Sequence, residues 1–244
     1  MLNLFRAPPT DLSILSYRMV PIHPFTMGPN LIDFQIDPKD YIDLSCSYFE
    51  LEWTLKKSDG NNTAANDRSY LVNNIAHSIF KQISVRLNGM LISPQTDTYH
   101  NKAYIETLLN YNRDDGETVL KPQGWFNAID LLDTLTANRL DQTHNDFGAL
   151  SEEYQHVVKT IQSENAKHAG GKARVFCFVP HIEVFHLRKL LVPQVQIGIQ
   201  MYFNSPDLWI KRGHSVLFEC CRHQSEIVSL PSETQSLRLQ GIDE

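Results

Sequence analysis

Hydrophobic and polar residues alternate with a period of two in several short segments of the chain. The clearest case is residues 195–203, where five apolar side chains alternate with Gln, Gly and Tyr. Residues 31–36 and 83–87 show the same alternation over a shorter length. Because successive side chains of a strand point to opposite faces, each of these segments predicts a β-strand with one buried face.

Two further segments predict strands, and one turn predicts a strand pairing. Residues 42–56 predict the longest strand, because apolar residues occupy every second position from 49 to 55. Residues 174–179 predict a strand that is partly apolar on both faces. The pair Asn88-Gly89 tolerates positive φ angles and precedes an apolar run, so it predicts a hairpin turn after residue 87.

The pattern changes after Pro94, where apolar residues recur at helical spacing. Tyr104, Leu108 and Tyr111 follow one another at i, i+4 and i+7, and the two apolar residues beside them are Ile105 and Leu109. This spacing predicts an amphipathic helix over residues 100–111. We expect this helix to lie in an inter-strand connection and to seal one end of a β-sandwich.

A second helix is predicted to begin after Ser151, which is a favoured N-cap residue. Glu152 and Glu153 follow it and suit the positive end of a helix. The apolar stripe of this helix comprises Tyr154, Val157, Val158 and Ile161. The pair Gly170-Gly171 is expected to end the segment.

Short strands separated by long loops that contain helices favour one architecture. We expect an all-β fold, an antiparallel jelly-roll sandwich with one or two helices inserted in inter-strand loops. Residues 1–30, which prolines interrupt, are expected to form an extended N-terminal arm. Residues 31–210 are expected to form the jelly-roll domain and residues 211–244 a divergent tail. Within the domain, residues 112–148 predict a long insertion loop with one or two helical turns.

Length and composition agree with a single large β domain. The chain has 244 residues, of which 42% are hydrophobic, and its formal net charge is −6. An acidic balance excludes a general electrostatic attraction to nucleic acid or to an anionic membrane, so any contact with nucleic acid is expected to be weak and local. No signal peptide and no apolar run of about 18 residues is present, so we expect an intracellular, non-secreted protein without a membrane partner.

The cysteines and histidines of the chain are its candidate metal ligands. The four cysteines form no CxxC pair, and Cys46 and Cys177 lie in apolar runs where buried free thiols are expected. His181 and His186 would face opposite sides of a strand, and the pair His77 and His100 has no carboxylate at a fixed spacing. The remaining candidate is a soft metal site in the tail, formed by His214, Cys220, Cys221 and His223. We expect no metal and no cofactor.

Motifs for catalysis are missing as well. The chain contains no GxSxG, no GxGxxG and no glycine-rich loop followed by Lys and Ser or Thr. The carboxylate pair Glu50 and Glu52 is expected on a solvated face. We therefore expect a protein that is not an enzyme and that acts through its surfaces.

Four segments in a fixed order resemble a known family. They read LFRAPPTD, DYIDLSCSYFELEWTLKK, VNNIAHSIFKQISVRLNGMLISPQTDTYHNKAYIETLLNY and PHIEVFHLRKLLVPQVQIGIQMYFN. The chain resembles the major capsid protein of Polinton (Maverick) elements and of the related adintoviruses, which belong to the double jelly-roll lineage. The third segment is the most specific, and the resemblance spans residues 2–210.

The resemblance implies a structural function without catalysis. It implies self-association into trimer-like or pseudo-hexameric capsomers, contact with other capsid proteins, and a location in the virion. The family's protein carries two jelly rolls in tandem, whereas this chain has patterned sequence for one. We therefore expect the N-terminal jelly roll of an apparently truncated copy from a transposable element. We expect residues 1–30 and 112–148 to carry much of the subunit contact, because their apolar residues lack a strand or helix that would bury them.

One alternative to the capsid interpretation stays open. A jelly roll without catalysis can bind a ligand such as a carbohydrate through exposed aromatic rings. Trp125, Tyr202 and Trp209 are the candidates for such rings. The alternative requires that these side chains be exposed.

Overall fold

The computed structural model describes residues 19–55, 61–64, 69–93, 95–126, 151–212 and 232–235. Its strands are β1 (Met19–Val20), β2 (Thr26–Met27), β3 (Leu31–Ile36), β4 (Tyr41–Asp43), β5 (Phe49–Trp53), β6 (Ser69–Leu71), β7 (Phe80–Leu87), β8 (Met90–Leu91), β9 (Arg174–Phe178), β10 (Leu190–Leu191), β11 (Ile197–Phe203), β12 (Ile210–Arg212) and β13 (Ser232–Gln235). Its α-helices are α1 (Ile75–Ser78), α2 (Tyr99–Asn110), α3 (Arg113–Glu117), α4 (Glu152–Ala166) and α5 (Pro206–Trp209). Short 3-10 helices are η1 (Leu44–Cys46), η2 (Lys121–Gln123), η6 (Ala169–Gly171) and η7 (Glu183–His186).

The strands pair in the nested order of a jelly roll. One sheet has five strands in the order β2-β3-β11-β7-β8, and β5 pairs with β9 in a second layer. All these pairs are antiparallel. The early strand β3 pairs with the late strand β11. Strands β5 and β9, which both lie between β3 and β11 in the sequence, pair with each other. This nesting is that of one long hairpin folded over to form two layers. The predicted fold class, an all-β antiparallel jelly-roll sandwich with inserted helices, is confirmed.

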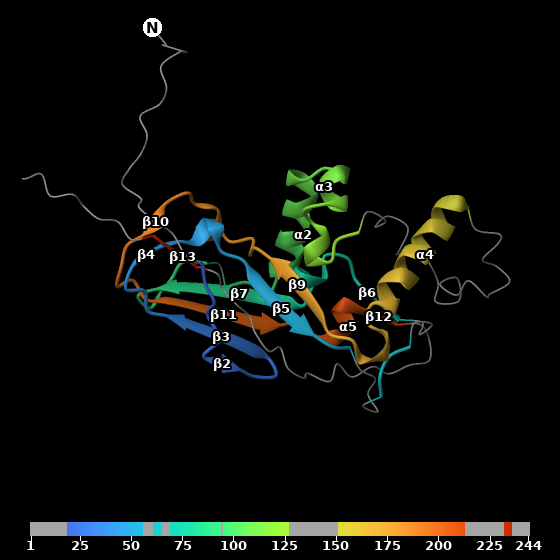
Figure 1. The fold of residues 1–244 in the computed structure, drawn as a ribbon, viewed down its shortest axis with the longest axis horizontal. Helices are drawn as coiled ribbons and strands as arrows, with labels where there is room; N and C mark the ends of the chain where they lie inside the picture. The colour runs from blue at the N-terminus through green and yellow to red at the C-terminus, as the bar shows by residue number, and fades with distance from the viewer. Residues whose placement is uncertain are drawn as a thin grey trace, which may run out of the picture.

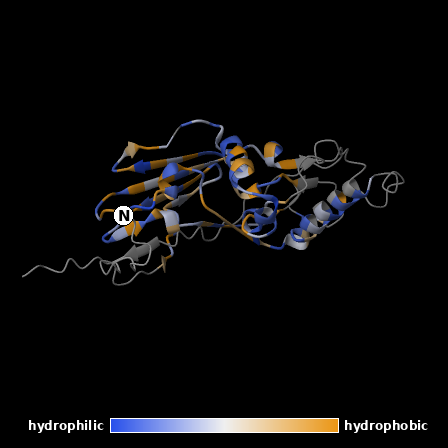
Figure 2. Cartoon of the chain, turned by 90° about the horizontal axis from the view of Figure 1, so that it is seen from above, coloured by the Kyte–Doolittle hydropathy of each residue, from blue (hydrophilic) through white to orange (hydrophobic). Residues whose placement is uncertain are grey.

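The core lies between these two layers. Phe34 of β3 contacts Phe49 of β5 with ring centroids 5.6 Å apart, and Phe80 of β7 lies 5.8 Å from Phe178 of β9. Alternate residues of β11 complete the inner face, because Ile199 and its neighbours two positions away are almost fully buried. Figure 2 shows the resulting alternation of hydrophobic and hydrophilic residues along the strands. The period of two therefore predicted the buried face of the sheet correctly.

The predicted hairpin turn is also confirmed. Asn88 and Gly89 have φ angles of 48° and 79°, which are the left-handed values that a two-residue hairpin turn requires. The Asn88 amide donates to the carbonyl of Gln196 at 2.9 Å, and the Asn88 side-chain oxygen accepts from the Gln196 amide at 2.9 Å. The turn is thereby tied to the start of β11.

The predicted long strand over residues 42–56 is wrong. The chain instead forms β4, the 3-10 turn η1 and β5. The Asp43 carboxylate accepts a hydrogen bond from the Ser45 amide at 2.9 Å, and the Ser47 hydroxyl donates to the Asp43 carbonyl at 3.1 Å. These local side-chain bonds satisfy backbone groups that a strand would pair with its neighbour, so the strand breaks there. Cys46 lies in this turn and is exposed, which corrects the prediction of a buried thiol, and Cys177 is half-buried.

The second predicted helix is α4, but it ends at Ala166, before the predicted Gly170-Gly171, and the two glycines belong to the 3-10 helix η6. Gly170 and Gly171 have φ angles of 75° and 74°, which glycine adopts without strain. Val158 is fully buried, and the other three residues of its predicted apolar stripe have side chains outside the described part of the chain. In that described part no helix is long and apolar enough to cross a membrane.

Some predictions fall on residues outside the described ranges. These are residues 1–18 of the expected arm, 127–150 of the expected insertion, and most of the expected tail. The first part of the insertion contains α3 and η2, which agrees with one or two helical turns. Strand β13 comes from the expected tail and pairs antiparallel with β1 and β4. The boundaries at residues 30 and 210 stay predictions.

Candidate functional site

Helix α2 packs on the body through a face that the apolar pattern did not predict. Its buried residues are Tyr99, Ala103 and Thr107, which recur every four positions. The large apolar residues Leu108 and Leu109 are 51% and 79% exposed. The helix itself was predicted correctly, but the expected orientation of its apolar stripe was wrong. A small residue and two hydroxyls allow α2 to approach α1 closely and to bond with the groups beneath it.

The exposed apolar side chains of α2 and of the following segment form a candidate contact surface. We call this set the apolar outer face, and it comprises Ile105 (55% exposed), Leu108, Leu109, Tyr111 and Val119 (64% exposed). Figure 1 shows α2 and α3 projecting from the body of the sandwich beside β9. Grouped exposed apolar side chains are typical of a surface that another molecule covers.

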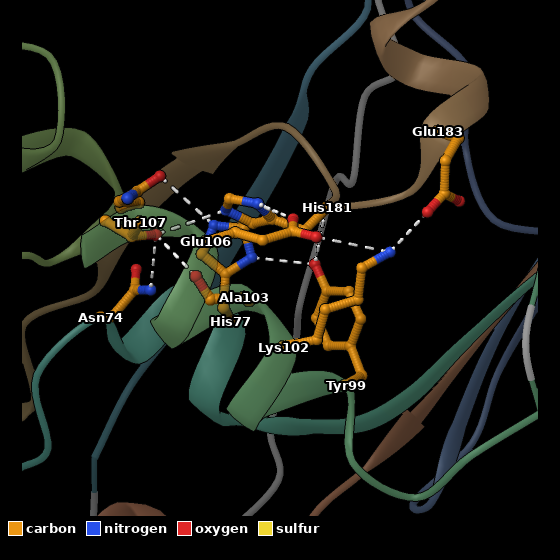
Figure 3. A network of polar contacts seen from close by, with 10 residues as sticks. Asn74, His77, Tyr99, Lys102, Ala103, Glu106, Thr107, His181 and Glu183 are labelled. Carbon is orange, nitrogen blue, oxygen red and sulfur yellow. Dashed lines mark hydrogen bonds and ion pairs between the residues drawn. The ribbon is translucent and has the colours of Figure 1, made fainter. Parts of the chain in front are cut away.

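A polar network joins α2 to the elements on which it packs (Figure 3). At its centre is His77 of α1, whose side chain is fully buried. Its Nδ1 lies 2.9 Å from the Tyr99 hydroxyl, and its Nε2 lies 3.3 Å from Oε1 of Gln123. The Tyr99 hydroxyl also accepts the backbone N–H of His181 at 3.3 Å. The network therefore links α1, α2, η2 and the connection that follows β9.

His181 is the second imidazole of the network. Its Nδ1 lies 2.8 Å from Oε2 of Glu106, and its Nε2 lies 3.4 Å from the Thr107 hydroxyl. The Thr107 hydroxyl donates its hydrogen to the carbonyl of Ala103 at 2.7 Å, so only its lone pairs face His181. The rings of His77 and His181 pack edge to face with centroids 4.8 Å apart.

Burial sets the protonation state of this pair. Desolvation, together with the neighbouring His181, lowers the pKa of His77 to about 3. Burial also lowers the pKa of His181, against an opposing effect of the Glu106 carboxylate. His77 is therefore neutral at neutral pH, and α2 rests on an uncharged ring.

An exposed ion-pair chain continues the network toward the surface. The Lys102 ammonium lies 2.8 Å from the Glu183 carboxylate and 3.7 Å from that of Glu106. The Lys102 hydrogen bond lowers the pKa of Glu183. Exposed pairs of this kind contribute little stability, so the buried hydrogen bonds hold α2 more firmly than the charges do. The whole arrangement clamps α2 to the connection that contains η7.

The expectations for the individual histidines had mixed outcomes. The prediction that His181 and His186 lie on opposite faces of a strand is wrong. His181 precedes the 3-10 helix η7 and His186 is its last residue, and their ring centroids are 6.2 Å apart. His77 and His100 were expected to have no carboxylate at a fixed spacing. The structure places Nδ1 of His100 3.3 Å from the side-chain amide nitrogen of Asn204. The tail residues His214, Cys220, Cys221 and His223 lie outside the described ranges. Among the residues that the structure describes, no group of three or more His, Cys, Asp and Glu side chains is arranged to hold a metal ion.

Sequence spacing could not have revealed the network. Its members His77, Glu106, Gln123 and His181 are separated by long stretches of chain and belong to no spaced motif. One weak signal was present, because Ala103 and Thr107 are small or polar residues at helical spacing in an otherwise apolar segment. Such a pattern is compatible with a helix whose close-packed face is not its most apolar face.

A third buried histidine, His168, lies between α4 and η6 and packs on Trp53 of β5 and Phe176 of β9, in a separate cluster. His168 Nε2 accepts from the Arg174 guanidinium at 3.1 Å, and the same guanidinium donates to Glu164 at 3.0 Å. Burial and the Arg174 charge lower the pKa of His168 to about 4. Trp53 packs on this ring and on Trp209.

The aromatic rings considered for ligand binding are mostly covered. Trp125 and Trp209 are buried, and Tyr202 is half-buried with its hydroxyl bonded to Gln200. The carbohydrate-binding alternative thereby loses the two exposed tryptophans that it required.

Comparisons with known proteins found one sequence relative and several structural ones. No protein-family model matches the chain. A Caenorhabditis elegans protein described as uncharacterized protein F54H12.2 is 30% identical over 102 residues, which cover 38% of this chain and 24% of that protein. The chain thus spans a quarter of the length of this relative.

The structural relatives come from viruses. They are PBCV-1 VP54 fitted into a reconstruction of the virophage Sputnik (11% identity, TM-score 0.44), the mavirus major capsid protein (11%, 0.42) and a chain of the Sputnik virophage (12%, 0.44). The matches cover 97%, 99% and 98% of this chain but 46%, 51% and 51% of those chains. Since all three TM-scores lie below 0.5, the fold assignment rests on the strand pairing of this chain itself.

Proposed function

We propose that this chain is a capsid-type structural subunit, the N-terminal jelly roll of a double jelly-roll major capsid protein of the Polinton (Maverick) or adintovirus kind. In this proposal it acts by self-association into a shell, together with other capsid proteins, and it performs no catalysis. Its location is then the virion. The proposal includes the division into an arm (1–30), a jelly roll (31–210) and a tail (211–244).

The observation that carries the proposal is the orientation of α2. A helix whose large apolar residues point away from the core of its own domain is suited to contact another subunit. The apolar outer face contains three large side chains on one helix, Ile105, Leu108 and Leu109. The four ordered sequence segments and the nested jelly-roll pairing support the same proposal from independent directions.

The contact surface proposed here differs in part from the one expected from the sequence. The sequence expectation placed subunit contacts on residues 1–30 and 112–148. Val119 of the apolar outer face belongs to that insertion, but its other members lie on or directly after α2. Two exposed side chains of the expected arm, Phe25 and Met27, remain part of the proposed contact area.

Light scattering coupled to size-exclusion chromatography tests the proposal. The expected result is a molar mass that rises with protein concentration toward a closed oligomer. The variant Leu109→Asp is expected to shift this rise to higher concentration, because a buried unpaired carboxylate is costly at an interface. Val192→Asp is the matched control, since Val192 is also exposed but follows β10, which pairs with β4, whereas α2 packs on α1 and β7. A strictly monomeric species over a wide concentration range, with no partner found, would contradict self-association.

A further inference from the structure

The two imidazoles lie where α2 meets α1 and the connection that follows β9. Tyr99 bonds to His77, while Glu106 and Thr107 of the same helix bond to His181. Of the three buried residues of α2, Tyr99 and Thr107 both belong to this network. Both rings therefore contribute to the attachment of α2.

His77 has both nitrogens engaged in its neutral form. The Tyr99 hydroxyl accepts the His181 amide hydrogen and has its own hydrogen left for Nδ1 of His77. The opposite nitrogen, Nε2, then carries the ring hydrogen and donates to Gln123 Oε1. A second proton on Nδ1 would meet a hydroxyl hydrogen inside a fully buried site. The ring would gain a charge without gaining a carboxylate partner.

Among the described residues, the hydrogen-bond partners of the His77 ring are the uncharged Tyr99 and Gln123 and not a carboxylate. The titratable groups of α2 and of the connection at η7 that face the network are Tyr99, Lys102, Glu106, His181, Glu183 and His186. The carboxylate among them that reaches the buried rings, Glu106, bonds to His181 and to Lys102. From β9 the ring meets the uncharged Phe178. Among the charged residues of η2, β7 and α5, Lys121 and Lys81 pair with the exposed carboxylates of Glu117 and Asp97, and Arg86 and Asp207 are exposed.

We propose that protonation of the His77–His181 pair releases α2 from α1 and from the connection that follows β9, so that mild acid moves the helix that carries the apolar outer face. Charging both rings would place two positive groups next to each other, with centroids 4.8 Å apart. A single carboxylate, that of Glu106 on α2, bonds to one of them, His181. Lifting α2 exposes the rings to water and relieves this repulsion. The inference goes beyond the proposed function, because the release is a property of a single chain.

The size and sign of the effect follow from proton linkage. The pKa of His77 is about 3 with α2 in place and returns to the ordinary 6.5 when the ring is solvated. The stabilisation of the seated helix is therefore fully present above pH 6.5 and is lost as the pH falls. Between pH 7.5 and pH 5.0 this single ring shifts the ratio of seated to released helix by about 30-fold. His181, whose pKa is also lowered, acts in the same direction.

Amide hydrogen exchange of the full chain at pH 7.5 and pH 5.0, corrected for intrinsic exchange rates, tests the release. The expected result is that residues 99–110 and 181–186 lose at least about ten times more protection at pH 5.0 than β7 and β11 do. Equal changes in all four segments, or loss of β7 and β11 at the same pH, would overturn the proposal in favour of global acid unfolding.

Three variants separate the switch from a simple structural effect. His77→Gln retains a group that bonds to Gln123 but does not titrate, and it is expected to flatten the pH step of α2. His168→Gln is the matched control, because it removes a buried histidine from a separate cluster and should leave the step in place. Glu106→Gln lies on a part-exposed side chain and remains usable if His77→Gln does not fold. It removes the charge that favours a proton on His181, so the step should move to higher pH. A step that stays unchanged in His77→Gln or in Glu106→Gln overturns the proposal.

Discussion

The central strands of the five-stranded sheet and helix α2 obey opposite relations between sequence and burial. In β3, β7 and β11 the apolar positions of the period-two pattern are the buried ones. In α2 the largest apolar residues are exposed, and Ala103 and Thr107 are buried. The sheet uses its apolar residues for its own core, whereas α2 uses small and polar residues to attach itself and leaves its apolar residues for another contact. Apolar pattern thus predicts burial only where the domain itself supplies the covering surface.

The largest expected effect is in the sheet. Phe34 is fully buried and packs edge to face on Phe49. Phe34→Ala should lower the free energy of unfolding by roughly 3–5 kcal/mol, because it removes a large side chain and leaves a cavity. Urea denaturation measures the change, and Val175→Ala, an exposed position on β9, is the control with little expected change. A loss of less than about 1 kcal/mol in the free energy of unfolding would contradict the statement that the apolar positions of the sheet form the core.

A smaller effect is expected on the buried face of α2. Ala103 is fully buried between the helix and the elements beneath it. Ala103→Leu should destabilise the protein by roughly 1–3 kcal/mol, because the larger side chain overpacks this contact. Asn101→Leu introduces the same residue at an exposed position of the same helix and should be close to neutral. If the two variants have equal stability, the close contact of α2 does not constrain side-chain size.

The third effect concerns the layer opposite the five-stranded sheet, where His168 is buried away from α2. Its pKa of about 4 lies below the ordinary 6.5, so its contribution to stability is present above pH 6.5 and is lost as the pH falls toward 4. At pH 5.0 this loss is about 2 kcal/mol relative to pH 7.5. His168→Gln keeps an acceptor for Arg174 and should reduce the acid destabilisation by that amount in thermal or urea unfolding. An unchanged pH dependence would contradict the neutral state of His168.

The smallest effect is expected on the exposed face of α2. Leu109 is 79% exposed, so Leu109→Ser should change the free energy of unfolding by no more than about 0.5 kcal/mol. The same substitution should weaken self-association, because it removes an apolar contact from the apolar outer face. Denaturation and light scattering on the same sample give the two results. A large loss of monomer stability would mean that the side chain is covered within its own chain.

Local patterns predicted the elements better than their mutual packing. The hairpin at Asn88-Gly89 was predictable because only the two turn residues decide its backbone angles. The break of the strand at Asp43 was missed, although the side chains that cause it are adjacent, because a Ser or Asp in a strand pattern does not reveal whether it bonds to its own backbone. The hydrogen-bond partners of His77 were missed for another reason, since Tyr99 and Gln123 come from two distant parts of the chain.

The sequence by itself determined the type of fold, since strand period, turn residues and helical spacing are local properties of the chain. It also determined which segments carry apolar surface. The tertiary structure alone decided which of these apolar side chains are buried within the chain, because burial depends on which helices and strands pack against one another. It likewise decided that His77 and His181 share one buried site, where the loss of water shifts the pKa of both rings. Desolvation arises only when segments distant in sequence close around a side chain, so no local pattern predicts it.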